Sequence, residues 1–482
     1  MSRGSLEGAS MDTGKGWLKA LRLSILVVLA ASAIAVGLAE SRLAHRLIEG
    51  LGYPALCQEL FSEVQSNYYM VRGLHPPQGV RLNIVNLRWV EENWAAGDGG
   101  DGELEVEEAI YKALMLIPDD VSLAAIRRRR ALSIMAAAAA GEVYVVEDYF
   151  NPLDRVEASK TLAHELTHIV QGYYFPVQDH VSTSFDESQA WNALIEGDAS
   201  YTADMYVERL KASEGCSAQG RGGEMPRSMV ELWLFPYRYG VGFVSHLYDV
   251  GGWMLVDKAY YKPPNTTEQI LHPEKYLMGE AYREVASPKP DGEYRILRTD
   301  RLGEYFVRVF LSTHISPETA AKASMGWNGD NFTYYKLDGG GDLFAWSIAW
   351  DTREDQEEFH ASIKEFMTAA EATPLGDNAW RIGWRQLTVT EDTAEGGYVT
   401  YLEISAGREP RHTWEENPPM GYGIWGTIRR GGRGRGIASE TPRGIIDRGE
   451  GKVWRRPIGR PVGDLTLEGV NARWSLRAAA EA

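Results

Sequence analysis

His164-Glu165-Leu166-Thr167-His168 is the stretch of this chain that most restricts its fold and its chemistry. On a helix, residues four positions apart lie on the same face, so the two imidazoles can share one Zn²⁺. The carboxylate of Glu165 stands beside them and can take a proton from a metal-activated water. The motif therefore predicts a zinc-binding helix.

The residues around the motif support a buried helix. Apolar side chains recur at helical spacing from Val156 to Val170. Asn151 followed by Pro152 predicts the start of the helix, and Gly172 predicts its end. Two histidines and a carboxylate on a largely apolar helix are seldom buried without a metal or a partner. The alternative is a surface helix with two unrelated histidines.

A second segment, Ala193-Leu194-Ile195-Glu196-Gly197-Asp198-Ala199, offers a third ligand. Apolar spacing predicts a helix over residues 188–210, and Glu196 lies close to its apolar face. Two histidines, one glutamate and an open position describe a catalytic rather than a structural zinc site. Asp204 could instead hydrogen-bond a ligand imidazole. The carboxylates that compete with Glu196 are Asp186, Glu187, Asp198 and Asp204.

Taken together, the two segments resemble the gluzincin superfamily, the thermolysin-like zinc metallopeptidases with HExxH and a downstream glutamate. The chain is most similar to poorly characterised members, membrane-anchored or lipoproteins, from bacteria and archaea. The similarity covers residues 50–370. It also rests on shorter blocks, which are Phe235-Pro236-Tyr237, Gly240, Phe243-Val244, Gly251-Gly252-Trp253, Pro263-Pro264, Thr267–Pro273, Tyr276, Gly326-Trp327, Gly329-Asp330 and Trp350-Asp351.

This resemblance implies an α+β, zincin-like catalytic unit, with a small mixed sheet and a largely helical zinc-bearing core. It implies that His164, His168 and Glu196 bind Zn²⁺ and that Glu165 is the general base. Peptides or proteins would be the substrates, cleaved by a metal-activated water.

The resemblance leaves two roles to candidates. Gluzincins use a Tyr or His beyond the third ligand to stabilise the oxyanion, and Tyr237 and His272 are the first candidates here. His246 lies in a helical run and is the weaker one; Arg238 is a weak candidate for binding a substrate carboxylate. The thermolysin pattern places an imidazole-orienting aspartate where this chain has Ser200.

Residues 142–147 read as a strand because β-branched and aromatic residues dominate them. In gluzincins an edge strand at this position pairs with the extended substrate. An interior strand without a substrate role is the alternative.

The N-terminal run from Leu23 to Ala39 carries no charge and follows Lys15, Lys19 and Arg22. It predicts a signal peptide or a transmembrane helix, and hence a membrane-anchored protein with an extracytoplasmic catalytic domain, or a secreted one. The two cysteines, Cys57 and Cys216, could form one disulfide in an oxidising compartment.

The charge composition divides the chain into an acidic body and a basic C-terminal segment. The 482 residues carry a net charge of −17, but residues 408–482 hold 14 Lys and Arg against 9 Asp and Glu. An acidic body argues against nucleic acid as a partner. The predicted regions are a signal segment (1–40), a small mixed α/β region (41–120), the zinc metallopeptidase core (121–380), a β-hairpin (381–407) and a weakly ordered Gly/Arg-rich basic tail (408–482).

The sequence thus predicts a zinc peptidase. The main rival is a non-catalytic extracytoplasmic binding or scaffold module that retains the zincin fold. A degenerate protease is expected to lose its base, and Glu165 is present, which favours the enzyme. A zinc hydrolase acting on a non-peptide amide remains open, because the ligands alone do not select the substrate.

Overall fold

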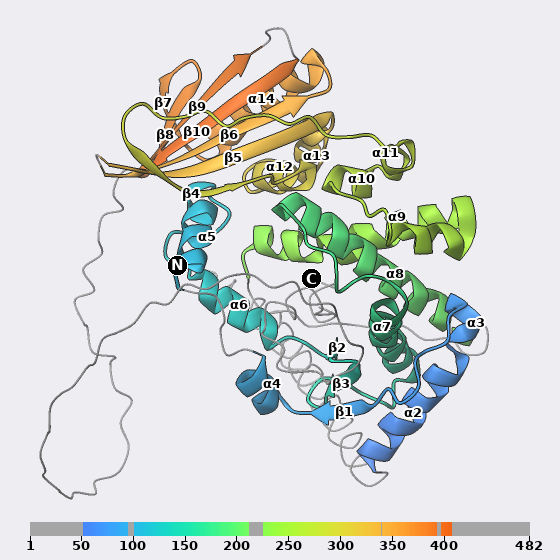
Figure 1. Cartoon of the computed structure of the whole chain (residues 1–482). Helices are drawn as coiled ribbons and strands as arrows, with labels where there is room; N and C mark the ends of the chain where they lie inside the picture. Colours follow the sequence, from blue (N-terminus) through green and yellow to red (C-terminus); the bar gives the residue numbers. More distant parts are fainter. Residues whose placement is uncertain (1–51, 95–100, 212–224, 339, 393–396, 407–482) are drawn as a thin grey trace, which may run out of the picture.

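The fold is α+β, as the sequence predicts, and contains two separate sheets with long helices between them (Figure 1). The computed structural model describes residues 52–94, 101–211, 225–338, 340–392 and 397–406. Five helices in the N-terminal part are α2 (Tyr53–Asn67), α3 (Tyr69–Arg72), α4 (Leu87–Asn93), α5 (Asp101–Ala113) and α6 (Leu123–Ala131).

The small sheet has three strands in the order β1-β3-β2, namely β1 (Leu82–Val85), β3 (Glu142–Val146) and β2 (Ala136–Ala139). The central strand β3 is parallel to β1 and antiparallel to β2, so the sheet is mixed. The strand predicted at 142–147 is therefore confirmed, but it is interior. The edge-strand interpretation is wrong for this segment, and the antiparallel edge strand is β2.

A run of alanines forms β2 because a tight turn follows it. Ala140 and Gly141 link β2 to β3 and both have positive φ, at 51° and 79°. A two-residue hairpin turn with positive φ at both positions matches the twist of the strands that it joins. The first three alanines of β2 are buried, and Ala136 and Ala138 pack in the core that the sheet shares with α7. Small side chains thus allow the helix to approach the sheet closely.

The helix α7 (Arg155–Tyr174) carries the HExxH motif. Its N-cap is Asp154, whose side chain accepts a hydrogen bond from the Glu157 amide. The predicted N-cap Asn151 lies in the preceding turn, where its side chain accepts from the Leu153 amide. The helix also continues one half-turn beyond Gly172.

The two longest helices, α8 (Phe185–Lys211) and α9 (Arg227–Ala259), cross at two glycines. A Cβ on Gly197 would lie 2.3 Å from the Gly240 carbonyl oxygen. A Cβ on Gly240 would lie 2.2 Å from the Ala193 carbonyl oxygen. Only glycine at both positions therefore permits this approach of the two backbones, one residue away from Glu196.

A proline inside α9 creates a second link to α8. Pro236 has no N–H, so the carbonyl of Leu232 lacks its usual donor within the helix. The side chain of Gln189 on α8 supplies that donor, with Nε2 2.8 Å from the Leu232 oxygen. The side-chain amide of Gln189 on α8 thus replaces the hydrogen bond that α9 loses at Pro236.

The C-terminal half contains a seven-stranded sheet in the order β4-β5-β6-β10-β9-β8-β7 (Figure 1, top). The predicted hairpin forms, because β9 and β10 pair antiparallel. The hairpin is part of the larger sheet, since β10 also pairs with β6 inside the predicted core. The elements are α10 (Thr267–Leu271), α11 (Pro273–Met278), β4 (Tyr294–Asp300), α12 (Glu304–Ser312), α13 (Pro317–Ser324), β5 (Trp327–Leu337), β6 (Asp342–Trp350), α14 (Arg353–Ala369), β7 (Thr373–Gly376), β8 (Ala379–Ile382), β9 (Arg385–Asp392) and β10 (Tyr398–Ala406).

The two largest hydrophobic clusters of the described residues lie on either side of α8. The larger one fills the space between α8, α9, α12 and the seven-stranded sheet, and includes Leu194 and the buried Trp346. The smaller one joins α2, α7 and the three-stranded sheet, and takes Tyr206 from the far end of α8. The helix that carries Glu196 is therefore fixed from both sides.

One prediction about the membrane is corrected. Within the described ranges, no helix is both long and apolar enough to cross a bilayer. The run Leu23 to Ala39, on which the predicted transmembrane helix rested, lies outside the described residues, as do Cys216 and the predicted tail 408–482. Cys57 is a buried free thiol in α2.

The repair of the α9 hydrogen-bond gap is testable. We expect Gln189→Leu to lower the free energy of unfolding by about 1–3 kcal/mol, because it leaves the buried Leu232 carbonyl without a donor. In a Pro236→Ala background, which restores the helical N–H, the same change should cost clearly less. Denaturant unfolding of the four proteins, followed by tryptophan fluorescence, measures the difference; equal costs in both backgrounds would contradict the assignment.

Candidate metal centre

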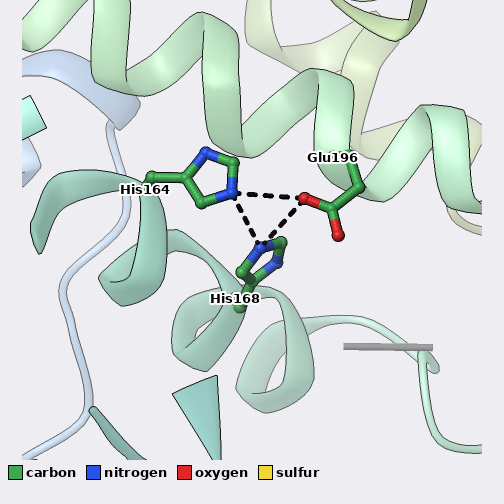
Figure 2. Close-up of side chains that lie close together, drawn as sticks. All are labelled: His164, His168 and Glu196. Atoms are coloured by element: carbon green, nitrogen blue, oxygen red, sulfur yellow. Dashed lines mark hydrogen bonds and ion pairs between the residues drawn. The ribbon is translucent and has the colours of Figure 1, made fainter. Parts of the chain in front are cut away.

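Two helices bring three predicted ligands together (Figure 2). His164 and His168 come from α7 and Glu196 from α8. The Nε2 atoms of the two histidines are 3.1 Å apart, and Oε2 of Glu196 lies 3.2 Å from His164 Nε2 and 3.3 Å from His168 Nε2. All three side chains are at least nine-tenths buried. Three donor atoms therefore form a nearly equilateral triangle.

This triangle has the size of one face of a zinc coordination tetrahedron. Zinc bonds of about 2.0–2.1 Å place neighbouring ligand atoms about 3.3–3.4 Å apart in tetrahedral geometry. The observed 3.1–3.3 Å is slightly shorter. Two imidazole nitrogens and one carboxylate oxygen are also donors that zinc accepts, and three protein ligands leave one position open. The residues therefore fit a catalytic zinc ion.

The hydrogen bonds of Gln171 fix the tautomer of His168. The side-chain Nε2 of Gln171 donates to the carbonyl of Ile195 at 2.9 Å and to Oδ2 of Asp198 at 3.3 Å. Its carbonyl oxygen therefore faces His168, whose Nδ1 must donate to it at 2.9 Å. With its proton on Nδ1, the neutral imidazole directs the Nε2 lone pair into the triangle, as a metal ligand requires.

The His164 ring is contacted by Ser200, the residue that stands where the thermolysin pattern has an aspartate. Oγ of Ser200 lies 3.4 Å from Nδ1 of His164. Ser200 stands one turn after Glu196 on α8, so it occupies the expected place for an orienting group. A hydroxyl replaces the carboxylate there.

Asp198, predicted only as a competing ligand, supports the centre from outside. Its carboxylate is fully buried and pairs with Arg72, with Nε at 2.9 Å from Oδ1. Tyr260 donates to Oδ2 at 2.7 Å, and Gln171 donates to the same atom. The carboxylate thus acts on His168 through the amide of Gln171, and Arg72 balances its charge.

The three other competing carboxylates have partners away from the triangle. Asp186 pairs with Arg301, Glu187 accepts from the backbone and hydroxyl of Thr183, and Asp204 forms an ion pair with Lys160. The prediction that Asp204 could orient a ligand imidazole is therefore not met by this arrangement.

The triangle holds a proton when no metal is bound. Burial disfavours the imidazolium of His168, but the charge and hydrogen bond of Glu196 outweigh burial and raise the pKa of His168 to about 9. Burial acts to raise the pKa of Glu196, but the two histidines overcome it and lower that pKa to about 2. A metal ion must displace this proton.

The remaining catalytic candidates differ in position. Glu165 is fully buried, and its charge contributes to the raised pKa of His168, which places it at the centre. The ring of Tyr237 lies 6.2 Å from that of His164, centroid to centroid, and is nearly parallel to it. The structure therefore brings both residues to the triangle.

The structure places three other candidates elsewhere. His272 lies between α10 and α11, where Nε2 is 3.2 Å from the Glu304 carboxylate of α12. His246 is a partly buried residue of α9, and Arg238 pairs with Glu231 on the same helix. The prediction of His272 as a residue of the catalytic centre is not supported by its contacts.

A cavity of about 310 Å³ opens beside the triangle. His168 and Ile169 of α7 form one wall, and Ala138 and Ala139 of the edge strand β2 form another. The remaining lining residues are Pro77, Gln78, Gly79, Val80, Gly141, Gly172, Tyr173 and Gln178. An extended chain in this cavity would lie along Ala138 and Ala139 of β2, next to a predicted ligand.

Sequence reasoning missed two contributions to this region. Gln171 lies three residues after His168 on the same helix face, and that spacing could have marked it as an orienting residue. The charge run Arg127 to Arg130 favours a solvated helix face in the sequence, but the guanidinium of Arg130 lies over the ring of Trp233, 4.8 Å from the ring centroid. The contact between Arg130 and Trp233 could not be predicted, because α6 meets α9 only in the fold.

The proton in the triangle predicts a pH dependence of zinc binding. Below about pH 9, His168 of the metal-free protein is protonated, so zinc must displace one proton. We expect the Kd for zinc to fall about tenfold per pH unit from pH 7 to 9 and then to level off. Competition with a chelator at several pH values measures this; a pH-independent Kd below pH 9 would contradict it.

The orienting role of Gln171 gives a second prediction. Gln171→Leu removes the acceptor of the His168 Nδ1 proton and should weaken zinc binding about 10–100-fold. Ser200→Ala, which removes the longer 3.4 Å contact to the other ring, should weaken it less. Chelator competition at one pH compares the three proteins, and wild-type affinity in Gln171→Leu would exclude the role.

Comparisons with known proteins concern the other half of the molecule. A family model described as "Domain of unknown function (DUF8575)" matches residues 294–408, which run from β4 to β10 and include α12, α13 and α14. No curated protein and no solved structure matches the chain. The matched segment contains the seven-stranded sheet and none of the three residues of the triangle.

Proposed function

We propose that this protein is a zinc-dependent peptidase that hydrolyses peptide bonds at the His164–His168–Glu196 centre. One observation carries the proposal: three ligand atoms stand 3.1–3.3 Å apart, and Gln171 accepts from Nδ1 of His168, so that Nε2 is the atom that binds a metal once its proton is displaced. A structural zinc site would fill all four positions with protein ligands, whereas this set supplies three.

The residues at the centre have distinct tasks. Zinc, when bound, lowers the pKa of water to about 7 and polarises a carbonyl group. Glu165 takes a proton from the attacking water and passes it to the leaving amine nitrogen. Tyr237, beside His164, supplies a phenol that hydrogen-bonds the developing oxyanion. Base and oxyanion donor thus come from different helices, α7 and α9.

The edge strand β2 supplies a place for an extended substrate. Its far side pairs with β3, and Ala138 and Ala139 line the cavity next to His168. A peptide that adds to this edge gains main-chain hydrogen bonds and needs no particular side chains for them. This arrangement suits a peptide better than a compact amide substrate.

The test compares the full chain with Glu165→Gln. Each protein should bind one zinc per chain by metal analysis, because Glu165 is not a ligand. Turnover of a broad peptide pool should fall about 10²–10⁴-fold in the variant, the usual contribution of a general base. Glu208→Gln, the same change at an exposed position of α8, is the matched control and should keep wild-type turnover.

Two outcomes would contradict the proposal. A protein that binds zinc but cleaves nothing in the pool, with or without Glu165, would be a binding module that retains the centre. A protein that binds no zinc would show that the triangle serves another purpose.

A further inference from the structure

Among the described residues, Arg130 has no carboxylate partner, and it lies at the edge of the candidate centre. Its neighbours on α6 behave as surface residues, since Arg127 pairs with Glu107 and Arg128 with Glu91. Within the described ranges, the guanidinium of Arg130 makes no ion pair and instead stacks over the ring of Trp233. Such a partly buried charge normally has an anionic partner.

Two residues of α9, Trp233 and Tyr237, connect Arg130 to the candidate metal centre. Trp233 lies one helical turn before Tyr237 on α9, and Tyr237 lies beside His164. Burial lowers the pKa of Arg130, and the nearby Tyr237 and Glu196 act on that pKa in the opposite direction. The cation is thus within electrostatic range of the third ligand. Arg130, Trp233 and Tyr237 all keep some exposed surface, so a ligand can reach them.

With zinc bound, the charge of Arg130 would have no negative charge at the centre to balance it. The carboxylates of Glu165 and Glu196 would balance the two charges of a zinc ion, so the guanidinium adds one positive charge. The ring of Trp233 covers one face of the guanidinium and holds its plane. Its N–H edge can then bind a carboxylate through two parallel hydrogen bonds.

We propose that Arg130 binds a carboxylate of the substrate beside the candidate metal centre, so that the enzyme selects peptides with an anionic group close to the cleaved bond. The proposal rests on the proposed peptidase function for the reaction, but not for the binding of the carboxylate. The carboxylate is either the C-terminus of the peptide or the side chain of an Asp or Glu.

The experiment uses three matched sets of short peptides and the full chain. One set is neutral with a free C-terminal carboxylate, the second is the same set with C-terminal amides, and the third is amidated with one internal Asn replaced by Asp. We expect kcat/KM to be about 10- to 100-fold higher for one carboxylate-bearing set than for the neutral amides. Which set is preferred identifies the source of the carboxylate.

Variants assign the preference to one side chain. Arg130→Gln should abolish the preference while changing cleavage of the neutral amides less than threefold, and Arg130→Lys should restore part of it. Arg128→Gln is the matched control, because it removes the same charge from the same last turn of α6 and should keep the preference. Equal losses on all three sets in Arg130→Gln would overturn the proposal.

A binding measurement separates this proposal from the function it rests on. Calorimetric titration of the peptides into Glu165→Gln, and into the same protein with Arg130→Gln, needs no turnover. A carboxylate preference that disappears with Arg130, in a protein that cleaves nothing, would keep this proposal and reject the peptidase. Cleavage without any such preference would keep the peptidase and reject this proposal.

Discussion

The contact between the backbones of α8 and α9 at Gly197 and Gly240 is the constraint on which the candidate centre depends. A metal centre built from two helices requires that their separation be fixed to within tenths of an ångström. Side chains could not fix it so closely, because rotamers adjust, whereas backbone against backbone cannot yield. Glu196 adjoins one glycine of the contact, and Tyr237 lies one turn from the other. The third ligand and the proposed oxyanion donor are thus placed by the same crossing.

A buried polar network transmits this rigidity to α7. The ion pair of Arg72 with Asp198 joins α3 to α8, and Gln171 extends it to the imidazole of His168. A kink at Gly252, with φ of 62° and ψ of −166°, turns the end of α9 so that Tyr260 also reaches Asp198. Only glycine adopts that conformation readily. Buried charges are tolerated here because each one has a partner.

Local patterns predicted the helices and the three residues of the triangle, because HExxH spacing and apolar periodicity can be recognised in consecutive residues. The α+β class was expected from the family resemblance. The position of β3 could not be predicted, since an interior and an edge strand differ only in what pairs beside them. Alanine by itself favours a helix, so the strand β2 depends on the turn at Ala140-Gly141 and on pairing with β3. Arg130 and His272 were misjudged because α6 approaches α9 and α10 approaches α12 only in the fold.

The network around Asp198 bears on the order of assembly. The carboxylate pairs with Arg72, which also pairs with the partly buried Asp257, and it accepts hydrogen bonds from Tyr260 and Gln171 in a structure that holds no ion. The buried Asp198 carboxylate therefore does not need a metal ion as its partner, unlike the ligands of small domains whose folding is driven by zinc binding. For the proposed peptidase, chain folding and zinc binding would then be separate events. Folded apoprotein would accumulate before it binds an ion, and the supply of zinc would set how much of the protein is active.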